Sequence, residues 1–186
     1  MLAGRDVIAK APTGTGKTMA FGIPIIERID PDSEDVQAVI LAPTRELAMQ
    51  ITDEMRQIAV CHEGVRLVCL YGGQPIAKQI NALKRRPQIV VATPGRLSDH
   101  MKRRTVTLGQ VQTVVLDEAD RMLDMGFIHD VTRILDKIPH RRNLGMFSAT
   151  ISREVMDISW VYQRDPEEIT VQATRENKPD ILQYRI

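Results

Sequence analysis

Short apolar runs alternate with longer segments of helical period along the chain. The apolar runs predict strands over residues 6–9, 37–41, 66–70, 88–92, 113–116, 145–147 and 168–171. Helices are predicted over residues 17–29, 45–59, 74–85, 95–103, 127–138 and 153–162. In the fifth helix, apolar residues recur every three or four positions from Phe127 to Ile138, and Pro139 ends the pattern. Strands that alternate with helices predict an α/β fold of three layers, with an open, mostly parallel sheet flanked by helices.

Length and composition narrow the class of protein. The chain has 186 residues, 43% of them hydrophobic, which is typical of one globular domain. Its 25 basic and 24 acidic residues nearly balance, so any nucleic acid would be held by local contacts and not by the overall field. No apolar stretch is long enough to cross a membrane, and we expect a cytoplasmic monomer. Cys61 and Cys69 form no metal-binding pattern and are predicted to be buried apolar side chains.

Six polar segments each directly follow a predicted strand, and they span residues 11–18, 43–47, 72–73, 93–96, 117–120 and 148–150. In an open parallel sheet, ligands bind outside the carboxyl ends of the strands. The six segments are therefore predicted to lie along one edge of the sheet. Basic clusters at 84–86, 102–104 and 141–142 come before strands, so we expect them at the opposite edge, near helix C-termini whose carbonyls favour positive charge.

The first of these segments has the spacing of a P-loop, with Ala11 where a glycine usually stands. Small residues there let backbone N–H groups surround phosphate oxygens. A lysine neutralises the charge of the phosphates, and a hydroxyl binds Mg²⁺. The alternative is a glycine-rich turn without function. The predicted ATP-binding residues are Ala11, Pro12, Thr13, Gly14, Thr15, Gly16, Lys17 and Thr18, with Lys17 also catalytic and Thr18 also a ligand of Mg²⁺.

Two carboxylates, Asp117 and Glu118, end a strongly apolar strand. A P-loop ATPase needs such a pair: Asp117 would hold Mg²⁺ through water, and Glu118 would orient or deprotonate the attacking water. An acidic pair in this position can also be a simple helix cap. The residues Asn177, Lys178 and Asp180 fit a guanine-recognition pattern, but no D-x-x-G occurs in the chain and a polar stretch precedes them, so we interpret them as part of a linker.

Taken in order, the six segments resemble the motifs of the DEAD-box ATP-dependent RNA helicases. They read Ala11–Thr18, Pro43-Thr44-Arg45-Glu46-Leu47, Gly72-Gly73, Thr93-Pro94-Gly95-Arg96, Asp117-Glu118-Ala119-Asp120 and Ser148-Ala149-Thr150. The resemblance covers essentially the whole chain and indicates the N-terminal RecA-like, helicase ATP-binding domain over residues 1–173. It implies a RecA-like P-loop NTPase fold, ATP and Mg²⁺ as cofactors, and ATP-dependent remodelling of RNA duplexes or ribonucleoproteins.

The resemblance also implies two further groups of residues. A polar link between the nucleotide site and strand separation falls on Asp120, Ser148, Ala149 and Thr150. Contacts to the RNA backbone, without a sequence code, fall on Pro43, Thr44, Arg45, Gly73, Thr93, Gly95 and Arg96. Thr44 and Thr93 could present helix N-termini to phosphates, although they could also be helix caps only, as could Ser148 and Thr150.

The chain departs from the family pattern in two ways. It contains neither the upstream aromatic residue and glutamine that read adenine in the family nor the second RecA-like domain, which supplies arginine fingers and half of the RNA groove. Residues 174–186 resemble the start of the interdomain linker. An arginine finger contributes about 10³–10⁵-fold in rate, so little turnover is expected from this chain alone.

Two alternatives to the helicase hypothesis stay open. One is a nucleotide-dependent module that binds RNA or a protein partner without turnover. The other is a DNA helicase with a related ATPase core, which Asp120 and the two segments at 43–47 and 93–96 disfavour.

Overall fold

The computed structural model describes residues 1–12, 14–138, 141 and 143–171. Seven strands form one sheet in the order β3-β4-β2-β5-β6-β1-β7, and every pairing is parallel. The strands are β1 (Val7–Lys10), β2 (Ala38–Leu41), β3 (Leu67–Leu70), β4 (Ile89–Ala92), β5 (Thr113–Asp117), β6 (Asn143–Ser148) and β7 (Glu167–Thr170). The predicted parallel α/β sheet is confirmed.

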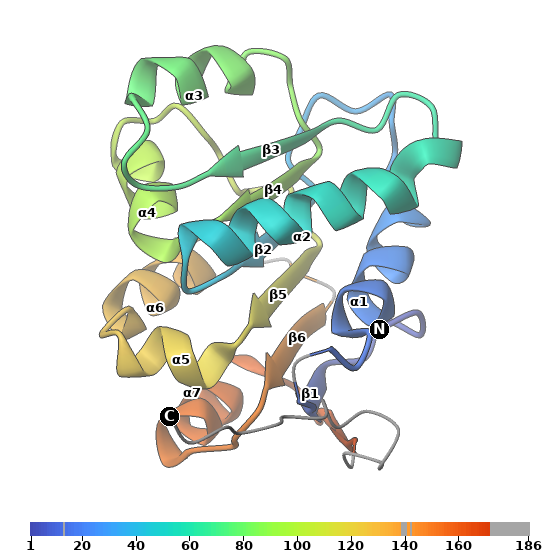
Figure 1. Ribbon diagram of the computed structural model, residues 1–186, viewed down its shortest axis with the longest axis vertical. Coiled ribbons are helices and arrows are strands. Elements are labelled where there is room, and N and C mark those ends of the chain that lie inside the picture. The colour runs from blue at the N-terminus through green and yellow to red at the C-terminus, as the bar shows by residue number, and fades with distance from the viewer. Residues whose placement is uncertain (13, 139–140, 142, 172–186) are drawn as a thin grey trace, which may run out of the picture.

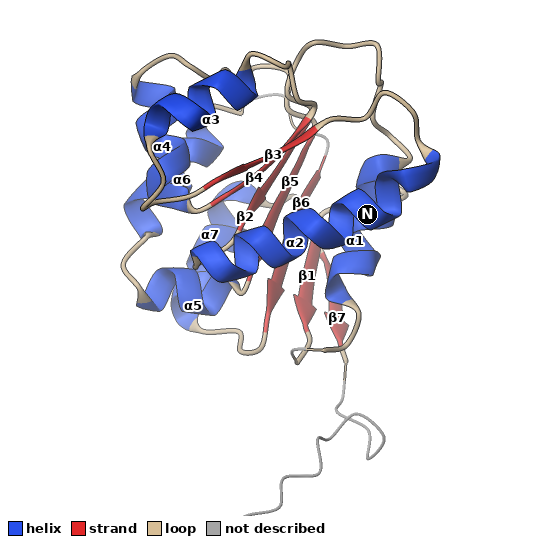
Figure 2. Cartoon of the chain, turned by 45° about the horizontal axis from the view of Figure 1, so that its top comes forward, coloured by secondary structure: helices blue, strands red, loops and turns tan. Residues whose placement is uncertain are grey.

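Helices cover both faces of this sheet. They are α1 (Lys17–Ile26), α2 (Arg45–Ile58), α3 (Ile76–Leu83), α4 (Pro94–Lys102), α5 (Ala119–Asp124), α6 (Ile128–Asp136) and α7 (Arg153–Tyr162), with a short 3₁₀ turn at Ala59–Cys61. Helices α1 and α2 lie across one face, and α4 to α7 lie behind the other (Figures 1 and 2). None of the helices in the described residues is long and apolar enough to span a membrane.

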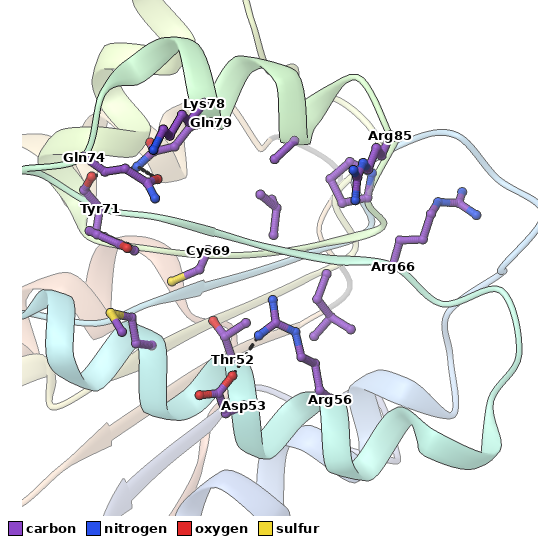
Figure 3. Close-up of a pocket in the computed structure, with 15 residues that line it drawn as sticks. Thr52, Asp53, Arg56, Arg66, Cys69, Tyr71, Gln74, Lys78, Gln79 and Arg85 are labelled. Carbon is purple, nitrogen blue, oxygen red and sulfur yellow. Dashed lines mark hydrogen bonds and ion pairs between the residues drawn. The ribbon is translucent and has the colours of Figure 1, made fainter.

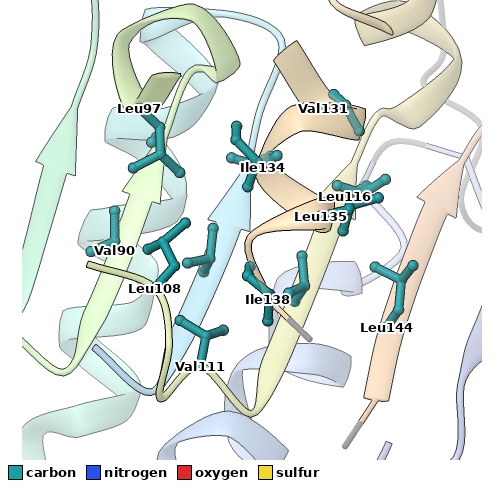
Figure 4. Close-up of a cluster of buried hydrophobic side chains, with 14 of the residues drawn as sticks. Val90, Leu97, Leu108, Val111, Leu116, Val131, Ile134, Leu135, Ile138 and Leu144 are labelled. Carbon is teal, nitrogen blue, oxygen red and sulfur yellow. The ribbon is translucent and has the colours of Figure 1, made fainter. Parts of the chain in front are cut away.

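The alternation of side chains along the central strands supplies both hydrophobic layers. In β2, Val39 and Leu41 pack in the cluster beneath α4 to α7, whereas Ala38 and Ile40 pack beneath α1 and α2. Successive strand residues point to opposite faces, so strands covered on both sides must be apolar throughout. Figure 4 shows the larger cluster, in which Ile134 of α6 lies among strand and loop side chains. The two hydrophobic clusters hold the strands in place, and with them the carboxyl ends of the strands, where the polar segments begin.

The structure differs from the sequence prediction in several local features. Helix α5 was not predicted, because its six residues are too few to show a helical period. Cys61 is exposed and Cys69 is half-buried, so the prediction that both are buried was wrong. The basic clusters at 84–86 and 102–104 do lie at helix C-termini, and Arg86 and Arg104 adopt left-handed backbone conformations there (φ 53° and 56°). Residues 174–186, including the guanine-like pattern, lie outside the described residues.

Candidate nucleotide and nucleic-acid site

The P-loop joins β1 to α1 at the carboxyl edge of the sheet (Figure 1). Gly14 and Gly16 have φ of 82° and 79°, in the left-handed region that other residues rarely adopt. A Cβ atom at either position would meet no neighbour within 4 Å, so backbone conformation and not space requires glycine there. Gly16 is the N-cap of α1, and Thr15 Oγ1 donates to the Pro12 carbonyl over 2.8 Å. Thr13 lies outside the described residues.

Lys17 and Asp117 meet beneath this loop. Lys17 Nζ lies 3.8 Å from Asp117 Oδ1 and 3.4 Å from the carbonyl oxygen of Ala11, and both charged side chains are almost fully buried. Burial raises the pKa of the Asp117 carboxyl to about 6, although the Lys17 ammonium acts in the opposite direction. At neutral pH the Asp117 carboxyl is charged although burial disfavours the charged form. A buried carboxylate of this kind is typical of a site that receives a cation or a charged ligand.

Glu118 follows Asp117 in a left-handed conformation, with φ of 49° and ψ of 51°. This conformation costs an ordinary residue about 1 kcal/mol, and it turns the chain from β5 into α5. The backbone N–H of Glu118 donates to Asp117 Oδ1 over 3.1 Å. Its carboxylate accepts a hydrogen bond from Arg121 Nη1, also over 3.1 Å. Glu118 is therefore held at the mouth of the site by an exposed arginine of its own helix.

These groups line one cavity of about 560 Å³. Gly14, Gly16, Lys17 and Thr18 form one side, and Asp117, Glu118 and Arg121 form another. The volume falls in the range of small-molecule sites. The sequence analysis assigned no site role to Arg121 or to three polar residues of α2 that line the cavity, Glu46, Gln50 and Glu54. The three α2 residues recur every fourth position on one helical face, which was a signal in the sequence that could have identified them.

The donor set suits Mg²⁺ held together with a phosphate. Thr18 contributes a hydroxyl and Asp117 a carboxylate, and oxygen ligands are the ones this ion prefers. Within the described residues, no group of three acidic, histidine or cysteine side chains could bind a metal unaided. Mg²⁺ commonly keeps several waters and takes only one or two carboxylates plus phosphate oxygens, so a larger cluster is not needed.

A second polar group connects β6 to α5. Asp120 Oδ2 accepts hydrogen bonds from the backbone N–H and the hydroxyl of Thr150, over 2.9 and 2.7 Å. Ser148 Oγ accepts from the Asp120 N–H over 3.1 Å, and the Ser148 carbonyl accepts from the Ala11 N–H over 2.9 Å. Burial acts to raise the pKa of Asp120, but the hydrogen bonds from Thr150 and Ser148 outweigh it and lower that pKa. Ser148 thus touches both the P-loop and Asp120, and Ala149 is exposed beside it.

The predicted RNA-binding residues lie along the β3, β4 and β2 part of the same edge. Thr44 is the N-cap of α2, and its Oγ1 accepts from the Leu47 N–H over 3.3 Å. Arg45 is exposed, with its guanidinium 5.6 Å from the centre of the Tyr71 ring. Gly73 is exposed with φ of 85° and lies next to Arg45. Pro43 is buried before the helix.

Helix α4 carries the remaining predicted residues. Thr93 holds the N-cap position, but its side chain makes no capping bond there. Gly95 lies in the first turn, against α6. Arg96 is turned inward and donates from Nη1 to the Gln74 carbonyl and to Gln79 Oε1, over 2.9 and 3.1 Å. Part of the charge predicted for phosphate contact is therefore engaged with the protein itself.

The DEAD/DEAH box helicase family profile matches residues 1–158. The chain belongs to the DEAD/DEAH box helicase family. Curated relatives include the DEAD-box ATP-dependent RNA helicase CshA of Bacillus licheniformis, 48% identical over 98% of this chain, and that of Bacillus subtilis, 46% identical over 98%. The chain spans 37% of the length of each of these two relatives.

Solved structures of the family share the fold. A DEAD box protein from the hyperthermophile Methanococcus jannaschii is 41% identical, with a TM-score of 0.84 over 90% of this chain and 46% of its own. The yeast DEAD-box splicing factor Prp28 is 35% identical, with a TM-score of 0.86 over 91% of this chain and 42% of its own. The predicted family and its RecA-like three-layer fold are thus confirmed.

Proposed function

We propose that this chain is the ATP-binding half of an ATP-dependent RNA helicase, which couples ATP binding and hydrolysis to remodelling of RNA duplexes or ribonucleoproteins. One observation carries the proposal: Lys17, Asp117 and Glu118 line a single cavity whose P-loop is bonded to Ser148, the partner of Asp120. The names of the curated relatives, ATP-dependent RNA helicases, support the same activity.

The roles follow from the geometry. The P-loop N–H groups and the N-terminus of α1 would receive the phosphates, and the Lys17 ammonium would leave Asp117 for the β/γ oxygens. Thr18 and Asp117 would hold Mg²⁺, which when bound neutralises charge on the phosphates. Glu118 would accept the proton of the attacking water. The four side chains given these roles all line the cavity.

RNA would bind at the neighbouring part of the edge, through its backbone. The N-terminus of α2, the exposed Arg45 and the exposed loop at Gly73 offer N–H groups and charge but no pattern that distinguishes bases. The link from Ser148 to Asp120 and Thr150 would pass changes at the P-loop to α5. Short polar side chains bonded in a chain move together, which supports the coupling role.

Turnover by this chain alone is expected to be low. The Glu118 carboxylate is paired with Arg121, and this exposed ion pair would have to open before Glu118 could orient a water molecule at the γ-phosphate. A second RecA-like domain would close over the cavity and supply cationic side chains, and arginine fingers contribute about 10³–10⁵-fold in P-loop enzymes. The second candidate function is a module that binds nucleotide and RNA without turnover, and the Glu118–Arg121 ion pair favours it.

The test is ATP turnover without nucleic acid, with single-stranded RNA and with single-stranded DNA of equal length, together with the binding of ATP and RNA. It compares the chain, its Glu118→Gln variant, and each of these mixed with the C-terminal RecA-like domain of a DEAD-box relative. Turnover that requires both the added domain and Glu118, and that RNA stimulates, supports the proposal. ATP and RNA binding without turnover in any mixture would indicate the binding module instead, and equal stimulation by RNA and DNA would contradict an RNA helicase.

A further inference from the structure

A second groove, of about 520 Å³, lies at the β3 edge of the sheet. Its floor is β3, one wall is α2 and the other wall is α3 (Figure 3). Within the described residues, β3 is the first strand of the sheet and pairs with β4 only. The groove therefore exposes the free edge of a strand between two helices.

The backbone of β3 shows which groups are free along this edge. The carbonyls of Arg66 and Leu70 accept hydrogen bonds from the N–H groups of Ile89 and Thr93, on the β4 side. Since alternate residues of a strand direct their backbone groups to the same side, Leu67 and Cys69 direct theirs into the groove. An edge with free N–H and C=O groups is a template for another strand.

The two walls differ in charge. On the α3 side, Lys78 and Arg85 are exposed and form no ion pair within the described part of the chain. On the α2 side, Arg56 is neutralised by Asp53, 2.7 Å away, and the other wall residues there are Met49 and Thr52. One wall is therefore cationic and the other is neutral and partly apolar.

We propose that this groove binds an extended segment of a partner protein, added as a strand to β3, whose acidic side chains at every second position face α3. Its intervening side chains, which face α2, are small or β-branched. The alternation follows from strand geometry, because successive side chains of the added strand point to opposite walls. The acidic side chains would pair with Lys78 and Arg85 on the α3 wall.

The floor of the groove favours a peptide over an RNA strand. The outward carbonyls of Leu67 and Cys69 accept hydrogen bonds from peptide N–H groups, whereas the phosphates of RNA offer only acceptors and would be repelled by them. A peptide strand satisfies both kinds of backbone group at once. This inference uses no residue of the nucleotide cavity and does not depend on the proposed function.

Cys69 provides a reporter inside the groove. The chain has two cysteines, so a Cys61→Ser variant leaves Cys69 as its only thiol. The probe is a fluorescent seven-residue peptide in which glutamate alternates with valine or threonine, and the control peptide has lysine in place of each glutamate. Affinity is measured by anisotropy, and access to Cys69 by its rate of alkylation with N-ethylmaleimide. We expect the glutamate peptide to bind about tenfold more tightly than the control and to slow alkylation.

Charge reversal then tests the α3 wall. Lys78→Glu together with Arg85→Glu should weaken binding of the glutamate peptide by about tenfold or more. Lys137→Glu changes an exposed lysine directly after α6, as Arg85 follows α3; it is the control outside the groove and should leave affinity unchanged. Unchanged melting temperatures show that the variants fold.

Any of three results would overturn the proposal. The first is equal affinity for the two peptides, and the second is peptide binding that leaves the alkylation rate of Cys69 unchanged. The third is protection of Cys69 by a ten-nucleotide oligouridine but not by the glutamate peptide. The last result would assign the groove to RNA. None of these measurements uses ATP turnover, so failure here is distinct from failure of the proposed function.

Discussion

Two polar clusters lie at the carboxyl edge of the same sheet, and their hydrogen bonding differs. Around Lys17 and Asp117, opposite charges are buried 3.8 Å apart and face an open cavity. Around Gln79, which is 1% exposed, nearly every polar atom has a partner inside the protein: Gln79 donates to the Tyr71 carbonyl and accepts from Arg96. The first cluster retains unused hydrogen-bonding capacity, and the second has almost none.

The two clusters also differ in the protonation state of their buried titratable groups, His100 and Asp117. His100 is fully buried, with Nε2 3.0 Å from Gln79 Oε1 and Nδ1 2.8 Å from Thr105 Oγ1. Burial, followed by the charge of Arg96, lowers the pKa of His100, so the neutral ring is favoured. Asp117 is instead kept in the costly charged state at neutral pH. The difference indicates that one cluster holds the fold together and the other is prepared for a ligand.

The largest expected effect is on nucleotide binding. Lys17→Ala should weaken the affinity for a fluorescent ATP analogue by on the order of 10²-fold, because it removes a buried charge that the phosphates would pair with. Lys10→Ala, an exposed lysine that ends β1, is the matched control and should bind like the parent chain. Equal affinity of the two variants would place the nucleotide elsewhere.

Gln79→Ala is expected to destabilise the second cluster. It removes the Gln79 amide oxygen that Arg96 Nη1 and His100 Nε2 both contact, and it leaves His100 Nε2 buried without a partner. We expect a loss of about 3 kcal/mol in the free energy of unfolding, measured in urea. Nucleotide affinity should hardly change. A large loss of nucleotide affinity without a loss of stability would reverse the roles assigned to the two clusters.

Asp117→Asn is expected to stabilise the protein at pH 8. The folded pKa of about 6 lies above the usual 3.8, so ionisation of Asp117 destabilises the folded state as the pH rises through 6. Replacement of Asp117 by Asn should raise the free energy of unfolding by about 2–3 kcal/mol at pH 8, and this gain should vanish below pH 4. The pH dependence that His100 contributes has the opposite sign: because its pKa is lowered, the free energy of unfolding falls as the pH falls below about 6.5. Urea unfolding of the parent chain and the variant across this range checks the sign.

The smallest effect concerns Glu118. Glu118→Gly relieves the left-handed backbone and should stabilise the protein by about 1 kcal/mol. Glu118→Ala loses the same carboxylate but keeps the Cβ, so it should show no such gain. Equal unfolding free energies for the two variants would mean that Glu118 carries no backbone strain.

Much of the nucleotide site at the carboxyl edge of the sheet could be predicted, because the residues of each of its segments are adjacent in sequence. The P-loop and the pair at 117–118 follow apolar strands, and a parallel sheet brings such segments together. The Gln79 cluster could not be predicted, because Gln79 and His100 lie 21 positions apart and are joined only by a side-chain contact between α3 and α4. For the same reason the sequence could not show that Arg96 turns inward.

The central claim is that Asp117 is a buried carboxylate prepared for a cation and a nucleotide. The most direct test is a ¹³C NMR titration of its side-chain carboxyl, assigned with Asp117→Asn, with and without Mg²⁺ and a non-hydrolysable ATP analogue. The account predicts a midpoint near pH 6 in the free protein, as burial dictates, and a clear decrease when both ligands are present. A midpoint near the usual 3.8, or one that the ligands leave unchanged, would contradict it.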